Sequence, residues 1–185
     1  MTDKESIQYA AEVLRGGGVV LHATEGVWGF ACDPFQPTAV EKILAIKGRQ
    51  AAKGFIVIGA EPAAFADQLA QVSVAHRGRV QASWPGAHTW ILPDDRYPSM
   101  IRGERPTLAC RVPGHVQARA LCNAFGATLV STSANRSGEA PLTRAAQAER
   151  EFGAQVDYFL WGEVDRAGSA STIYGLQGEI LRAGG

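Results

Sequence analysis

The chain has 185 residues, of which 46% are hydrophobic, and its 18 basic side chains balance 18 acidic ones. This length suits one domain, residues 1–185, with a sizeable core. The apolar share is too high for a disordered chain, and no apolar run approaches the ~20 residues that cross a bilayer. Zero net charge argues against a protein that coats nucleic acid by bulk electrostatics, but it allows a local basic pocket.

Cysteine usage and the first residues predict a cytoplasmic protein. Cys32, Cys110 and Cys122 are an odd number without C-x-x-C spacing, so neither a disulfide framework nor a structural zinc site is expected. The first six residues, MTDKES, are polar, and a cleaved secretory signal is therefore not predicted.

The first helix has the clearest local signals. Apolar residues recur at helical spacing from Ile7 to Leu14, and Thr2 and Glu5 stand at capping-box spacing before them. Glycines 16–18 end this helix, because glycine accepts the left-handed conformation found after helix C-termini.

The later elements follow from apolar runs and turn residues. Further helices are expected from Thr38, as the N-cap, to 46, and at 62–69, 75–83, 116–125 and 143–152. Strands are expected at 19–22, 55–58, 89–92, 107–112, 128–131, 158–160, 171–174 and 179–181. Turns are expected at 23–29 and 84–86, and a long exposed loop at 93–106. Strands alternate with helices before the C-terminal strands cluster, which predicts an α/β domain with a partly parallel, partly antiparallel sheet.

Four segments are unusually polar: three follow or contain predicted strands, and the fourth, 47–49, follows a predicted helix. Ligands of open α/β sheets bind in the crevice formed by strand ends and the loops that leave them. These segments are 23–26, 47–49, 107–111 and 131–135. Lys47, Arg49 and Lys53 have no acidic neighbour among them, so they either complement the dipole of the preceding helix or clamp an anion. The hydroxyl-rich segment 131–135 either binds phosphate or carboxylate oxygens or forms an ordinary turn.

Other familiar chemistries lack their motifs. The sequence contains no P-loop, no G-x-G-x-x-G after a strand and no G-x-S-x-G elbow. The four histidines are scattered, and Cys32 and Cys110 are better explained as small buried side chains than as reactive thiols. The residues alone therefore predict an α/β domain with an anion site.

Taken together and in order, several segments resemble the YrdC-like family, the threonylcarbamoyl-AMP synthases. The segments are HATEGVWG at 22–29, KGR at 47–49 followed by Lys53, WPGAHT at 84–89, ACRVP at 109–113, STSANRSG at 131–138, STI at 171–173 and ILRAG at 180–184. The resemblance spans nearly the whole chain, is closest to the short bacterial form, and implies an open twisted mixed sheet with helices packed on it.

The resemblance implies that L-threonine, bicarbonate and ATP yield threonylcarbamoyl-AMP and pyrophosphate, with Mg²⁺ carried by the triphosphate and no protein metal site. It implies partner proteins that transfer the threonylcarbamoyl group to tRNA, with RNA or tRNA as a further partner and no membrane. The residues implied to be catalytic are Lys47, Arg49, Ser133 and Asn135. The residues implied to bind ATP are Lys47, Arg49, Lys53, Thr107, Ser133, Asn135 and Arg182. Those implied to bind L-threonine are Thr24, Arg111, Ser131 and Ser171, with Arg111 as the partner of its carboxylate.

Two alternatives remain at this point. One is a carbamoyl-adenylating relative that uses carbamoyl phosphate, although the acylphosphatase and zinc-finger segments of such proteins are not found in this sequence. The other is a non-catalytic RNA-binding module, for which Lys42, Lys47, Arg49 and Lys53 would supply a basic face.

Overall fold

A single mixed sheet organises the protein, whose computed structural model describes residues 2–165 and 170–184. The strands of the described residues are β1 (Val20–Ala23), β2 (Trp28–Cys32), β3 (Ile56–Ile58), β4 (His88–Pro93), β5 (Thr107–Arg111), β6 (Leu129–Ser133), β7 (Tyr158–Phe159), β8 (Thr172–Tyr174) and β9 (Ile180–Arg182). Their order across the sheet is β7-β1-β2-β6-β3-β5-β4-β8-β9. The pairs β1–β7, β3–β5 and β4–β8 are parallel and the others antiparallel, which confirms the predicted mixed sheet.

All the helices of the described residues except α5 (Ser99–Arg102) form where the apolar periodicity predicts them. The others are α1 (Asp3–Arg15), α2 (Pro37–Lys47), α3 (Ala66–Ala70), α4 (Val74–Ala82), α6 (Val116–Phe125) and α7 (Ala145–Phe152), with short 3₁₀ turns at Ala51–Lys53, Pro62–Phe65 and Gly153–Gln155. The predicted capping box of α1 is confirmed, because Glu5 N donates to Thr2 Oγ1 while Thr2 N donates to Glu5 Oε2. Among the described residues, no helix combines the length and apolar character needed to span a bilayer.

Three local expectations are wrong. Helix α2 begins at Pro37, so Thr38 lies within the helix and is not its N-cap; proline is favoured at the first helical position because an N–H there would have no partner within the helix. The segment 23–29 is a turn only in its first part, since β2 starts at Trp28 and pairs with both β1 and β6. The segment 93–106 is no exposed loop, because it contains α5 and buries Asp94 and Ile101.

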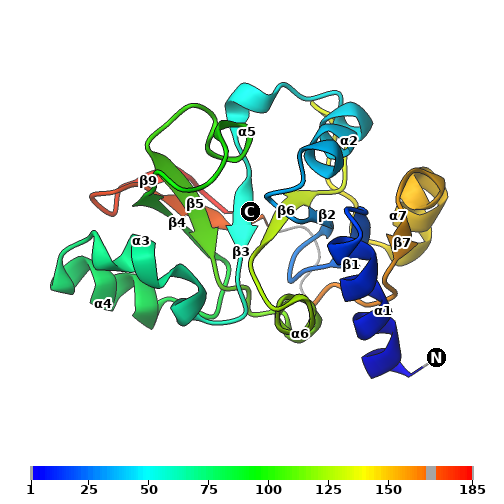
Figure 1. Cartoon of the computed structure of the whole chain (residues 1–185), viewed down its shortest axis with the longest axis horizontal. Coiled ribbons are helices and arrows are strands. Elements are labelled where there is room, and N and C mark those ends of the chain that lie inside the picture. Colours follow the sequence, from blue (N-terminus) through cyan, green and yellow to red (C-terminus); the bar gives the residue numbers. More distant parts are fainter. Residues whose placement is uncertain (1, 166–169, 185) are drawn as a thin grey trace.

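The two faces of the sheet are covered unequally. Successive side chains of a strand point to opposite faces, so Val57, Cys110 and Val130 enter a large core shared with α2, α3, α4 and α7. Figure 1 shows α3 and α4 beside the half of the sheet that holds β4, and α2 and α7 beside the half that holds β1 and β2.

The opposite face carries a smaller core. Helices α1 and α6 cover Val20, Ala31, Ile58 and Leu129 there, with Ala10, Leu14, Leu121 and Cys122 as helix partners. On the same face a cavity lies over β3, β5 and β6 instead of a helix. Because α1 and α6 cover only part of this face, the part over β3, β5 and β6 is open to a ligand.

Candidate active site

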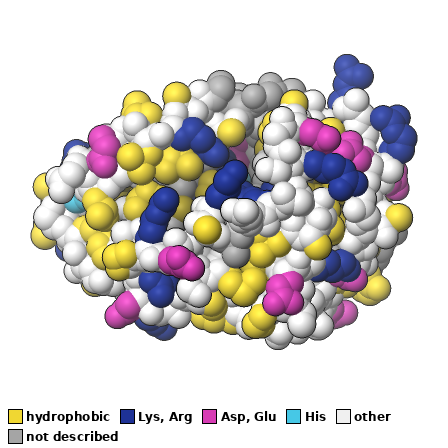
Figure 2. Space-filling view, turned by 90° about the horizontal axis from the view of Figure 1, so that it is seen from above, with side chains coloured by type: hydrophobic (Ala, Val, Ile, Leu, Met, Phe, Trp, Pro, Cys, Tyr) yellow, Lys and Arg dark blue, Asp and Glu magenta, His cyan; other side chains and the backbone are white. Residues whose placement is uncertain are grey.

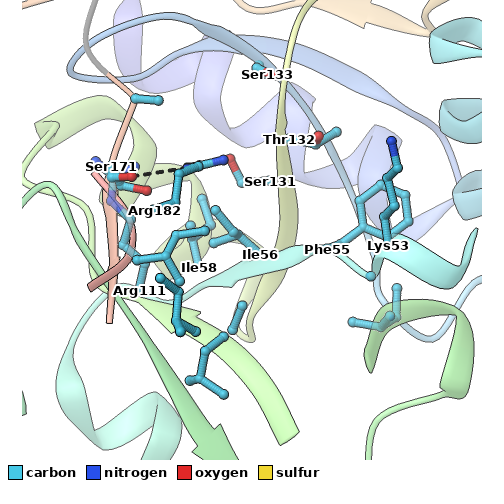
Figure 3. A pocket seen from close by; sticks show the side chains of 18 of the residues that line it. Lys53, Phe55, Ile56, Ile58, Arg111, Ser131, Thr132, Ser133, Ser171 and Arg182 are labelled. Atoms are coloured by element: carbon cyan, nitrogen blue, oxygen red, sulfur yellow. Dashed lines mark hydrogen bonds between the residues drawn. The ribbon is translucent and has the colours of Figure 1, made fainter. Parts of the chain in front are cut away.

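The cavity has a volume of about 380 Å³, and its floor is the sheet itself. Alternate residues of neighbouring strands form this floor, namely Ile56, Ile58, Thr107, Ala109, Arg111, Ser131 and Ser133. The site was expected in a crevice beyond the strand ends, but the cavity lies on the face of the sheet. No helix covers the side chains that point to this part of the face, so they line the cavity. Figure 3 shows Arg182 between Ser171 and Ser131, with Lys53 on the other side of the cavity.

Nine of the eleven residues expected to form the site line this cavity. They are Thr24, Arg49, Lys53, Thr107, Arg111, Ser131, Ser133, Ser171 and Arg182. They come from segments more than 150 positions apart in the sequence, so their convergence is a property of the fold. Lys47 and Asn135 are not among the lining residues.

The cavity is strongly cationic. Arg49, Lys53, Arg111 and Arg182 line it together with Arg102 and Arg105, and none of the described residues contributes a carboxylate to the lining. Figure 2 shows lysine and arginine side chains interspersed with apolar ones on the face seen from above. Arg102 and Arg105 were missed by the sequence analysis, since they belong to the segment interpreted as an exposed loop. An anion is the ligand that such a lining favours.

Two of the arginines each donate to a backbone carbonyl and have lowered pKa values. Arg49 donates through Nη2 to the carbonyl of Gly54 at 2.6 Å and lies over the Phe55 ring, 5.2 Å from its centroid. Burial, and then the charge of Arg182, lower the pKa of Arg49. Arg182 donates to the carbonyl of Ser171 at 3.0 Å, and burial followed by the charge of Arg111 lowers its pKa. A bound anion would relieve this mutual repulsion.

Lys47 lies behind the cavity wall and is only 3% exposed. Its ammonium donates to the carbonyl of Ser133, and to the carbonyl and Oδ1 of Asn135 at 3.1 Å each. Ser133 Oγ also donates to Asn135 Oδ1, at 2.6 Å. Burial, and then the charge of Arg49, lower the pKa of Lys47 to about 8. Lys47 therefore ties the end of α2 to the loop after β6, and a direct contact of Lys47 or Asn135 with phosphate stays a prediction.

Hydroxyl groups occupy the other end of the cavity. Thr24 Oγ1 donates to the carbonyl of Val27 at 2.6 Å, and Ser171 Oγ shares a 2.8 Å hydrogen bond with Thr89 Oγ1. The Ser131 hydroxyl forms no hydrogen bond with another described residue of the chain, and neither does that of Thr107, at the opposite end of β5 from Arg111. Within the described part of the chain, both hydroxyl groups therefore remain available to a ligand.

Arg111 is oriented by two contacts near this end. Its Nε donates to the carbonyl of Gly86 at 3.0 Å, and its Nη2 forms an ion pair with Glu25 Oε2 at 2.7 Å. The Arg111 and Glu25 side chains are 11% and 15% exposed. Glu25 was not among the expected site residues, although its place directly after Thr24 in a polar segment was a signal that it belonged to the site.

Fold and site together define an α/β protein with a cationic cavity on an uncovered sheet face. A family model named for Sua5, YciO and YrdC and described as "Telomere recombination" matches residues 12–184. The chain therefore belongs to this Sua5/YciO/YrdC family, as its motifs suggested.

Similar proteins bear consistent names. A threonylcarbamoyl-AMP synthase of Nitrosococcus oceani is 43% identical over 95% of this chain and 96% of its own length. A protein of the same name from Halorhodospira halophila is 46% identical over 85% of this chain and 83% of its own length. The crystal structure of P. abyssi Sua5 complexed with L-threonine superposes with a TM-score of 0.91 at 29% identity. It aligns with 98% of this chain, which spans only 55% of the P. abyssi chain.

Proposed function

We propose that this protein is a threonylcarbamoyl-AMP synthase, a nucleotidyltransferase that makes threonylcarbamoyl-AMP and pyrophosphate from L-threonine, bicarbonate and ATP. The names of its relatives support this proposal. The observation that carries it is the cavity itself, where cations from distant segments line one space together with hydroxyl groups, and where the described residues contribute no carboxylate.

The proposed reaction needs this combination of groups. The neutral amine of threonine adds to bicarbonate, and loss of water leaves a carbamate. A carbamate oxygen then attacks the α-phosphorus of ATP, and the bond to the bridging oxygen breaks as pyrophosphate leaves. Both reactants of this second step are anions, so the arginines lower their repulsion and stabilise the charge on the leaving group. Holding both in one cavity supplies the proximity that the step requires, and no protein nucleophile takes part.

The triphosphate end is formed by the unpaired cations. We assign Arg49, Lys53 and Arg182 to phosphate binding, with Thr107 and Ser133 as hydroxyl ligands of ATP. Lys47 and Asn135 complete this end by fixing the Ser133 loop and by adding a positive charge behind it. Together with Arg49, these loop residues form the set that we propose to be catalytic.

The amino-acid end is formed by Arg111 and its neighbours. Arg111 would bind the threonine carboxylate, with Thr24, Ser131 and Ser171 as hydroxyl ligands. The Ser171 carbonyl accepts a hydrogen bond from Arg182, so the two proposed ends share a border. The carbamate formed on threonine would therefore lie beside the α-phosphate.

Magnesium would arrive with ATP. Among the described residues, no group of three or more His, Cys, Asp or Glu side chains is arranged to hold a metal ion, and the cavity lining holds no carboxylate. These residues do not fit a protein cage for Mg²⁺, so the triphosphate and water would supply its ligands.

The proposed product would pass to proteins that transfer the threonylcarbamoyl group to tRNA, in the cytoplasm, with residues 1–185 acting as one domain. A purely RNA-binding role has less support. Lys42 forms an ion pair with Asp157 at 2.7 Å and Lys47 is buried, so the cluster Lys42, Lys47, Arg49 and Lys53 does not form one exposed basic face.

One assay separates the candidate functions. Purified protein is given ATP and bicarbonate, with and without L-threonine, and pyrophosphate is measured. We expect release that depends on threonine and is lost in Arg49→Ala. The matched control is Arg150→Ala, which removes an exposed arginine of α7. Release that requires carbamoyl phosphate instead would support a carbamoyl-adenylating enzyme, and no release with either compound would contradict the proposal.

A further inference from the structure

Glu25 connects two loops at the amino-acid end of the cavity. It follows Thr24, whose N–H donates to the carbonyl of Val27 at 3.1 Å and closes the turn between β1 and β2. Glu25 Oε1 accepts a 2.5 Å hydrogen bond from Gly114 N, in the loop after β5, while Oε2 reaches Arg111. A Cβ at Gly114 would lie 3.2 Å from Oε1, so the absence of a side chain permits this close approach.

The ion pair with Glu25 distinguishes Arg111 from Arg49, Lys53 and Arg182, the cations assigned above to phosphate binding. Within the part of the chain that the structure describes, Arg49, Lys53 and Arg182 form no ion pair, whereas Arg111 pairs with Glu25. The proposed phosphate end therefore carries positive charge that no carboxylate of the described residues pairs with, whereas at the Arg111 end the Glu25 carboxylate, which lies behind the lining, offsets the charge of Arg111. A highly charged anion favours the first end, because Coulomb attraction scales with the product of the charges.

We propose, on the basis of the function proposed above, that Glu25 is a positioning and selectivity residue that reserves the Arg111 end for the amino acid and excludes phosphate groups from it. The pairing fixes Nη2 of Arg111, and Gly86 fixes Nε, so the guanidinium presents its remaining donors in one orientation. The negative charge of Glu25 repels a phosphate group that approaches Arg111. An amino acid is tolerated there, because it carries one carboxylate and one amine. Such a repulsive element is a general way to build specificity.

The test measures threonine binding by calorimetry without turnover, at increasing concentrations of inorganic phosphate. In the wild-type protein we expect phosphate to leave the threonine Kd nearly unchanged. In Glu25→Gln, which keeps an acceptor for Gly114 N but loses the charge, we expect phosphate to compete and to raise that Kd about tenfold. Glu149→Gln, an exposed substitution on α7, is the matched control and should behave as wild type.

A second variant separates charge from position. Glu25→Asp keeps the charge with a shorter reach, so we expect threonine to bind more weakly while phosphate still fails to compete. Equal threonine Kd values for wild type and Glu25→Gln at every phosphate concentration would overturn the inference. Failure of the wild-type protein to bind threonine at all would instead contradict the proposed function.

Discussion

One face of the sheet has two halves that differ in what covers them. Beneath α1 and α6 the strands present Val20, Ala31 and Leu129, all fully buried. Beyond these helices the same face presents Ser131, Ser133 and Arg111 to the cavity. Strand β6 crosses the border, and its side chains on this face change from Leu129 to Ser131 in one alternation.

The difference between the covered and the open half shows which part of this sheet face stabilises the fold and which part is available for binding. The covered half gains free energy by removing apolar surface from water. The open half holds Arg49, and Lys47 lies behind its wall; burial lowers the pKa of both side chains, so their positive charges cost stability until an anion binds. Substitutions in the two halves should therefore change different measurable quantities.

The largest expected effect is on stability in the covered half. Leu129→Ala removes a fully buried side chain beneath α1 and α6, and we expect it to lower the free energy of unfolding by about 2–5 kcal/mol. Ser131→Ala, two residues further along the same strand face, should lower it by less than about 1 kcal/mol and raise the threonine KM. Denaturant unfolding of both variants measures the two losses in the free energy of unfolding. Equal losses would contradict the expected difference between the two halves.

The next effect is on activity in the open half. Arg49→Ala should lower kcat/KM by about 10²–10³-fold, because an oriented charge at the proposed phosphate site is lost. Its free energy of unfolding should stay close to that of the wild type, since the arginine has no ion-pair partner among the described residues. Steady-state kinetics and a thermal melt on the same preparation test both parts, and a loss of activity that merely follows unfolding would contradict the assignment.

A third effect depends on pH and concerns His22, which lies on β1 beside the border of the two halves. Burial, and then the charge of His115, lower the pKa of His22 to about 4 from its usual 6.5. Above pH 6.5 the ring is neutral in both folded and unfolded chains, and stability is complete. Between pH 6.5 and 4 only the unfolded chain takes up the proton, so roughly 3 kcal/mol should be lost as the pH falls.

His22→Gln provides the comparison for this pH dependence. Urea unfolding from pH 7 to pH 4 should show a shallower decline for the variant than for the wild type, because one source of proton uptake is removed. Parallel declines would mean that other groups account for the acid sensitivity.

The smallest effect concerns the charge behind the cavity wall. Since the pKa of Lys47 is lowered to about 8, its ammonium should lose a proton between pH 7 and pH 9. We expect ATP to bind up to about tenfold more weakly at pH 9. In Lys47→Arg, whose guanidinium stays charged, calorimetry should show a flat profile over this range; a decline as steep as that of the wild type would assign the effect to another group.

Local signals predicted much of the fold. Helix α6 has the predicted bounds, and the Thr2–Glu5 capping box forms, because helix periodicity and capping depend on residues a few positions apart. Strand β2 was missed because it is stabilised by β1 on one side and by the distant β6 on the other. The segment 93–106 was misjudged for a similar reason, since buried Asp94 is held by Gln68, Nε2 to Oδ1 at 2.7 Å.

The sequence predicted which residues form the site better than it predicted how they are arranged. Motif order identified Arg111 and Arg182, which do meet across one cavity. The sequence could not show that the Lys47 ammonium is directed at the Ser133 and Asn135 carbonyls, or that Glu25 reaches Arg111 from another loop. These contacts depend on how strands far apart in sequence align, and spacing along the chain contains no such information.

The most direct test of the account is a crystal structure with L-threonine and a non-hydrolysable ATP analogue. The account predicts the triphosphate beside Arg49, Lys53 and Arg182 on the open half of the sheet face, with the threonine carboxylate on Arg111. Ligands bound elsewhere, for instance in the separate cavity lined by Gln68, Tyr97 and Thr128, would contradict it.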